Sequence, residues 1–580
     1  MQAEFGDKSK ENQGTTRTTN NMNNLFKGHI VDVVNHEIYD GEFVIENGRI
    51  TSLRRVKLPE NKEFSYFMPG FIDSHVHIES SMMTPREFAR VAVTHGSIGA
   101  IADPHEIANV MGVDGIDFMI RSSEKVLFNF CFGAPSCVPS CGGDIETNGA
   151  VIDAKTTEQL MARDDIGFLA EMMNYVGVLG GDPEVLAKIE AARRHGKPVD
   201  GHAPGLTGEQ RLQYARAGIS TDHECSTIEE GRSCVAANMS VIIREGSAAK
   251  DYKKLSSLIG ESPESVLFCT DDCHPDDLVR GHINLTVKRA MQDGYDLWDI
   301  LQAACVNPQK HYGLSWGLLQ EGDPATFIIV KNFGPNFRVT NTIIRGREAF
   351  SYNTSIGSRR DMTKAFDEVI ITGENYPNNF VASPITEEDI RLDIQKGDTA
   401  HIILASEGSL LTGHDIVQIA GDPLKDARYP WHDVQKIVVY NRYEQGAKPR
   451  VGLIRGFGIT HGAIASTIAH DCHNIVAIGS SDEYIVKAIN RIVEMKGGLV
   501  AIADNEMRDL PLPIAGLISP LDGFEVAYGN RLICDMAEDA GCVLKAPFIT
   551  MGFMCLPVIP ELKLTDKHLW DSSAMQVIRS

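Results

Sequence analysis

The middle of the chain alternates short apolar runs with amphipathic stretches. The apolar runs are short and rich in β-branched residues, which favours buried strands. Segments with helical periodicity separate most of them, for example 85–94, 183–195 and 208–217. The predicted strands are 71–78, 98–102, 127–132, 167–172, 198–201, 219–222, 240–244 and 266–270. Eight strands alternating with helices over roughly 250 residues predict an α/β fold, a (β/α)8 TIM-like barrel over 69–320.

Two β-rich segments flank the predicted barrel. In 25–68, short apolar runs lie on either side of Asn47-Gly48, a dipeptide that favours a hairpin turn. A similar pattern returns in 321–356. We therefore expect the two flanks to form one small β-sandwich domain. Residues 1–24 are polar and lack periodicity, so we expect a disordered tail there.

Residues 361–580 are expected to form a separate C-terminal α+β domain. Strand-like runs occur at 400–404, 436–440, 475–479 and 499–503. A helix is expected over Asp482–Met495, because Gly497-Gly498 supplies a C-terminal cap signal. The turn His470-Asp471-Cys472-His473 has two interpretations. It forms either a lid or accessory ligand group over the barrel, or a polar turn that satisfies its own hydrogen bonds.

Polar side chains at the ends of the predicted strands indicate a metal site. Side chains alternate along a strand, so His75 and His77 lie on one face of the first strand. Active-site residues of a (β/α)8 barrel lie at the C-terminal strand ends. Four further residues that could bind metal occur there: Glu171, His202, His223 and Asp271. Each alone is more often a structural residue, but together they favour a centre that binds divalent metal.

Composition narrows the class of protein. The net charge is −23, from 78 acidic and 55 basic residues, which argues against a nucleic-acid partner. No apolar run approaches the roughly 20 residues of a membrane span. The 12 cysteines show no disulfide framework, and no hydrophobic signal segment precedes them. We therefore expect a cytoplasmic protein with reduced thiols and no membrane partner.

The arrangement of these motifs resembles the amidohydrolase superfamily. That superfamily has His-x-His on strand one, a carboxylate on strand four, histidines on strands five and six, and Asp on strand eight. From about residue 28 into the C-terminal region, the chain further resembles the bacterial adenine deaminase family. The segments that carry this resemblance are 69–82, 102–110, 170–174, 200–205, 222–225, 243–250, 269–272 and 468–475.

This resemblance implies hydrolytic deamination of free adenine to hypoxanthine and ammonia by a metal-bound hydroxide. It implies two divalent metals per subunit, Mn(II) or Fe(II), although the ligands would also suit Zn(II). The implied metal ligands are His75, His77, Glu171, His202, His223 and Asp271. Among them Glu171 would bridge the metals where many relatives use a carboxylated lysine, and Asp271 would also carry protons. Glu171, His223 and Asp271 are the implied catalytic residues, and a homodimer or homotetramer is the expected assembly.

The chemistry of adenine supports a metal centre. Adenine C6 is a poor electrophile, so attack at neutral pH needs hydroxide, and a divalent metal lowers the pKa of bound water from 15.7 to about 7. An acid near N1 must also donate a proton as the ring becomes tetrahedral. Glu79, Glu106 and Glu224 are candidates, because each follows a strand that opens toward the site. Each could instead fix a ligand histidine.

Three other functions compete with this interpretation. Cyclic-amide hydrolysis of the dihydropyrimidinase type usually uses a bridging lysine, whereas this chain has Glu171. The small zinc deaminase fold requires Pro-Cys-x-x-Cys, which the sequence lacks. A non-catalytic barrel would be favoured by the loss of a ligand, and none is missing.

Overall fold

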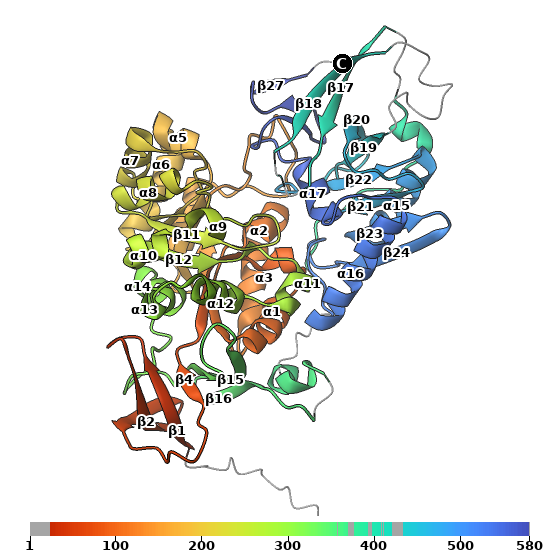
Figure 1. Ribbon diagram of the computed structural model, residues 1–580. Coiled ribbons are helices and arrows are strands. Elements are labelled where there is room, and N and C mark those ends of the chain that lie inside the picture. Colours follow the sequence, from red (N-terminus) through yellow and green to blue (C-terminus); the bar gives the residue numbers. More distant parts are fainter. Residues whose placement is uncertain are drawn as a thin grey trace, which may run out of the picture.

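The computed structural model describes residues 24–355, 358–368, 376–392, 397–407, 409, 411–419 and 433–578. The chain runs from a small sheet, through a barrel, to a second sheet-containing domain on the other side of the barrel (Figure 1). The predicted tail lies outside the described residues except for Asn24, which begins the first strand.

Both flanks of the barrel join a single sheet of seven strands, in the order β16-β15-β14-β4-β1-β2-β3. Its strands are β1 (Asn24–Asp32), β2 (Glu37–Glu46), β3 (Arg49–Arg55), β4 (Tyr66–Met68), β14 (Phe327–Lys331), β15 (Arg338–Ile344) and β16 (Arg347–Ser351). Asn47-Gly48 turns the chain between β2 and β3, and both residues have positive φ, as a tight hairpin requires. The flanks predicted as a sandwich are thus hydrogen-bonded into one continuous sheet.

The central unit is a parallel (β/α)8 barrel, which confirms the predicted fold class. Its strands are β5 (Phe71–His77), β6 (Ser97–Ala102), β7 (Asn129–Ala134), β8 (Ile166–Met172), β9 (Val199–Gly201), β10 (Thr221–Asp222), β11 (Ser240–Arg244), β12 (Val266–Cys269) and β13 (Asp271–Asp272). Beyond Thr270, β12 continues into β13, which pairs with β5 and closes the ring. Every residue of β5 and β6 is buried, as expected for strands covered on both faces.

Helices surround the barrel. They are α1 (Pro85–Ala92), α2 (His105–Met111), α3 (Val113–Ser123), α4 (Ala154–Met161), α5 (Tyr175–Gly180), α6 (Pro183–Arg194), α7 (Gly208–Arg216), α8 (Ile228–Ala236), α9 (Tyr252–Leu255), α10 (Leu258–Glu261), α11 (Pro275–Arg280), α12 (Ile283–Asp293), α13 (Leu297–Leu301) and α14 (Asn307–His311). Among the predicted barrel helices, α6 shows why a helix start can be recognised in the sequence: Asp182 caps α6 and Pro183 occupies its first turn.

The C-terminal domain contains an eight-stranded sheet in the order β18-β17-β20-β19-β22-β21-β23-β24. Its strands are β17 (Thr399–Leu404), β18 (Gly413–Gln418), β19 (Val434–Tyr440), β20 (Arg450–Arg455), β21 (Gly462–Ser466), β22 (Ile475–Gly479), β23 (Gly498–Ala503) and β24 (Glu506–Pro511). The remaining elements are α15 (Asp482–Met495), α16 (Gly523–Asp539), α17 (Pro547–Phe553), β25 (Leu562–Leu564), β26 (Leu569–Asp571) and β27 (Gln576–Val577). The bounds of α15 and β22 agree with the prediction.

The C-terminal domain packs against the barrel through α16, which lies beside α1 and α11 (Figure 1). Asn530 of α16 donates a hydrogen bond to Asp276 of α11 at 3.1 Å. Gly523, the first residue of α16, donates its backbone N–H to Glu87 of α1 at 3.1 Å. Among the described residues, no helix is both long and apolar enough to cross a membrane.

Candidate active site

The end of β5 brings two imidazoles together. His75 and His77 are buried, and their Nε2 atoms lie 3.2 Å apart. The Nδ1 atom of His77 lies 3.1 Å from the carbonyl oxygen of Asp103. A carbonyl only accepts, so in neutral His77 Nδ1 carries the proton and Nε2 keeps its lone pair toward His75. Burial, with His223 and His77 nearby, holds the pKa of His75 well below its usual value, so the His75 ring is neutral.

Glu171 at the end of β8 lies between two groups of histidines. Its Oε2 is 2.6 Å from Nδ1 of His202 and 3.1 Å from Nε2 of His223. Its Oε1 faces the other way, 3.4 Å from Nε2 of His77. The two oxygens of one buried carboxylate therefore serve separate histidines. This is the arrangement that a ligand shared by two metal ions requires.

Asp271 completes the group from the opposite side. Its Oδ1 lies 3.1 Å from Nε2 of His77 and 3.8 Å from Nε2 of His75. Its Oδ2 accepts a hydrogen bond from Nη1 of Arg244, in β11, at 2.9 Å. Burial opposes ionisation, but the His77 contact and the Arg244 charge hold the pKa of Asp271 well below its usual range.

The donor set fits divalent metal ions. Ligand atoms of His75, His77 and Asp271 lie within 4.8 Å of one another, and so do those of His75, Glu171 and His223. Nitrogen and carboxylate oxygen donors in this combination suit Mn, Fe or Zn. The structure thus brings all six predicted ligands together at the C-terminal ends of the barrel strands.

Two further residues, His105 and Arg244, contact the ligand group but were not among the predicted site residues. His105, the first residue of α2, places Nδ1 3.2 Å from both Asp103 and Glu171. Its ligand atom belongs to a further group with His77, Asp103 and Glu171. Arg244 contacts Asp271, Glu224 and Asp251. The sequence feature that could have identified them is a polar side chain at or just beyond the end of a predicted barrel strand: Arg244 ends 240–244, and His105 follows 98–102 by three residues.

The three predicted substrate acids have different surroundings. Glu79 accepts a backbone hydrogen bond from Ile107 on one oxygen, while its other oxygen, Oε2, is buried and has no partner among the described residues. Burial raises the pKa of Glu79 to about 7. Both oxygens of Glu224 face Arg244. Both oxygens of Glu106 contact histidines of the C-terminal domain.

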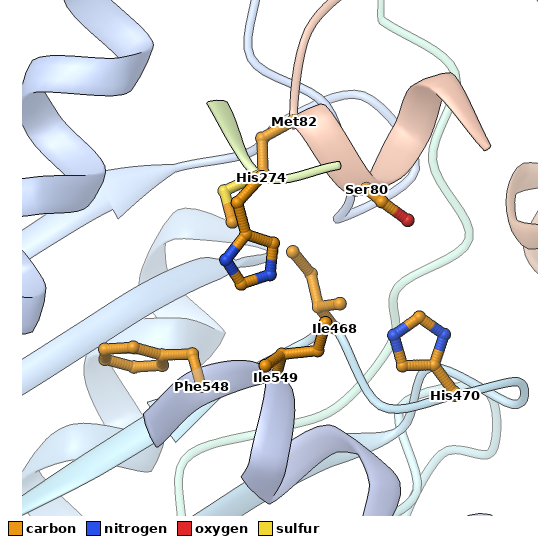
Figure 2. A pocket seen from close by; sticks show the side chains of 7 residues that line it. All are labelled: Ser80, Met82, His274, Ile468, His470, Phe548 and Ile549. Carbon is orange, nitrogen blue, oxygen red and sulfur yellow. The ribbon is translucent and has the colours of Figure 1, made fainter. Parts of the chain in front are cut away.

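The C-terminal domain reaches the barrel through the turn after β21. His470 places Nδ1 2.6 Å from Glu106, and His473 contacts the second oxygen of the same carboxylate. Beside this contact a small cavity opens between the domains (Figure 2). Ser80 and His274 line it from the barrel, and Ile468 and His470 from the C-terminal turn. The turn therefore bonds to the barrel through Glu106 and does not satisfy only its own hydrogen bonds; its role as a lid or ligand group stays a prediction.

A (β/α)8 barrel with this ligand group at its strand ends defines a metal-dependent hydrolase of the amidohydrolase class. Comparison with known families agrees, since residues 66–349 match the amidohydrolase family model and residues 409–576 match the adenine deaminase C-terminal domain. The family therefore also implies binding of divalent metal.

Curated relatives narrow the class. The chain is 44% identical to adenine deaminase of Salinibacter ruber over 95% of this chain and 98% of that protein. It is also 44% identical to adenine deaminase of Sulfurovum sp. over 96% of this chain and 99% of that protein. The chain belongs to the adenine deaminase family. Among solved structures, 5-methylcytosine deaminase from Klebsiella pneumoniae is 14% identical with a TM-score of 0.42, covering 58% of this chain and 100% of that one.

Replacing Arg244 by Met should lower the reaction rate while leaving all six candidate metal ligands in place. Asp271 would lose the charge that orients it, so we expect kcat to fall about 100-fold, as when one positioned charged donor is removed. Steady-state kinetics of the folded variant measure the effect. Arg232→Met is the matched control, because Arg232 pairs with Glu261 on the surface. Wild-type kcat in Arg244→Met would contradict this role.

Proposed function

We propose that the protein deaminates free adenine hydrolytically to hypoxanthine and ammonia. Membership of the adenine deaminase family supports this reaction. The structural observation that best supports this reaction is the position of Glu171. Its carboxylate is buried between two groups of ligand histidines, with one oxygen toward each group. A bridging lysine of the dihydropyrimidinase type has no counterpart at this position.

Two divalent metal ions would occupy the site. His75, His77 and Asp271 would hold one ion, His202 and His223 would hold the other, and Glu171 would contact both. When bound, the ions would lower the pKa of water from 15.7 to about 7 and so supply a nucleophile at neutral pH. We propose Mn(II) or Fe(II) as the native ions, following the family resemblance.

Asp271 is the residue that we propose as the proton carrier. Arg244 holds its Oδ2, which leaves Oδ1 toward the ligand histidines and the reacting atoms. Asp271 takes a proton from the attacking water and passes it to the exocyclic amine, which leaves as ammonia. The oxygen of that water remains on C6 of the product.

Glu79 is the acid that we place at purine N1. Glu106 and Glu224 have both oxygens engaged by other side chains, whereas Oε2 of Glu79 has no partner among the described residues. Its raised pKa of about 7 lets Glu79 hold a proton at neutral pH. It gives this proton to N1 as the bond to C6 forms, and the C6 hydroxyl proton later restores the acid.

We also propose a cytoplasmic enzyme that assembles as a dimer or tetramer and acts on a free base. All 12 cysteines are free, as expected in a reducing compartment. The strongly acidic composition favours a free base over a base within a polymer. The assembly stays a prediction from the family resemblance.

Purified protein loaded with Mn(II) should release ammonia from adenine, and more slowly or not at all from adenosine and cytosine. Ammonia release and hypoxanthine formation are measured together, since hydrolysis requires them in equal amounts. Removing the metal with a chelator should abolish both, and adding Mn(II) should restore them. Metal-loaded protein that is inactive on adenine would refute the proposal.

Replacing Asp271 by Asn should lower kcat by about 100- to 10,000-fold, the range for loss of a general acid or base. The amide is almost the same size as the carboxylate, so the fold should survive, which circular dichroism checks. Asp114→Asn, at an exposed position in α3, is the matched control. Unchanged kcat in Asp271→Asn would exclude the assigned proton transfer.

A further inference from the structure

The turn from Thr467 to Asn474 carries a buried acid, Asp471. Asp471 is 4% exposed, and its Oδ2 has no hydrogen-bond partner among the described residues. Its neighbours in the turn, His470 and His473, both contact Glu106 of α2 and so hold the turn on the barrel. Asp471 is therefore fixed at the barrel but does not take part in the docking contact.

A buried carboxylate without a partner costs free energy, and such a group in a folded protein calls for an explanation. Burial and the nearby Glu106 raise the pKa of Asp471, while His105 and His470 oppose this increase. Glu171 is also among the charges that act on it. Contacts link this turn to the ligand group: His470 contacts Glu106, which lies 3.6 Å from His105, and His105 lies 3.2 Å from Glu171. A donor on a molecule bound there would supply the missing partner of Asp471.

A small cavity lies between the two domains beside this turn. The cavity in Figure 2 lies between Ser80, from the turn that follows β5, and His470, from the turn that carries Asp471. Met82, Phe548 and Ile549 give it an apolar wall. The sequence neighbours of these two polar residues are Glu79 and Asp471, each of which has one buried oxygen without a partner among the described residues. Side chains from both domains thus meet at this small cavity of about 10 Å³, beside the turn that carries Asp471.

We propose that Asp471 binds the substrate by accepting a hydrogen bond from the imidazole-ring N–H of the purine, and thereby selects free bases over nucleosides. This inference rests on the proposed deamination of adenine. Free adenine has one ring N–H, on the imidazole ring at N9 or N7, and N9 lies on the edge away from C6. A nucleoside carries its sugar at N9 and has no such donor. With C6 at the ligand group and N1 at Glu79, Asp471 would hold the remaining edge of the ring.

The test compares adenine with 9-methyladenine, which keeps the reacting amine and lacks the ring N–H. Sites built to bond a substrate N–H reject analogues without it, so the wild-type enzyme should prefer adenine at least about 100-fold in kcat/KM. Asp471→Ala should lower kcat/KM for adenine about 10- to 100-fold, the loss of one hydrogen bond to a charged group. The loss should appear mainly in KM and leave 9-methyladenine nearly unaffected.

Asp471→Asn is the second variant, because it keeps the size of the side chain and a neutral acceptor, and its loss should be smaller. Neither variant should lower the melting temperature, since an unpartnered charge is removed. Asp535→Asn, at an exposed position of α16, controls for the change in net charge. If wild-type protein is inactive on adenine, the proposed function fails. If it deaminates adenine but both variants keep the wild-type preference over 9-methyladenine, only the role of Asp471 is refuted.

Discussion

The Glu171 carboxylate is the group on which the rest of the site depends. It is buried at the end of β8, where an isolated charge would be costly. Burial opposes its ionisation, but the surrounding imidazoles, first His202 and His223, hold its pKa well below the usual range. The barrel makes this possible, because parallel strands deliver their C-terminal residues to one place. Strand geometry brings the candidate ligand residues together, and the imidazoles compensate the buried charge of Glu171.

The sequence predicted those features that depend on residues close together in the chain, such as strand faces and helix ends. Alternation along β5 placed His75 and His77 on one face, and the structure brings their Nε2 atoms to 3.2 Å. The Gly497-Gly498 signal predicted the end of α15 correctly, because a glycine pair ends a helix within a few residues; the structure adds Ser481 as the N-terminal cap. The ligand positions at strand ends followed from the fold class, since every parallel barrel exposes those ends to one opening.

Contacts between segments far apart in the sequence could not be predicted from these local patterns. Glu106 and His470 are separated by 364 residues, and no pattern within either segment names the other. The sequence showed only an acid after one strand and a polar turn after another, so Glu106 was a candidate for substrate binding. In the structure its contact with His470 and His473 joins the C-terminal domain to the barrel opening. The C-terminal domain is therefore adjacent to the candidate active site, and Asp471 lies in the turn that makes this contact.

Metal content tests the central claim that one carboxylate serves two ions. Elemental analysis of Mn(II)-loaded protein, after removal of unbound metal, should give two ions per chain for the wild-type protein. Glu171→Gln should retain one or none, because the amide is a weak ligand and both ions lose their shared charge. Glu209→Gln, on the exposed surface of α7, should retain two. Two tightly bound ions in Glu171→Gln would contradict the account.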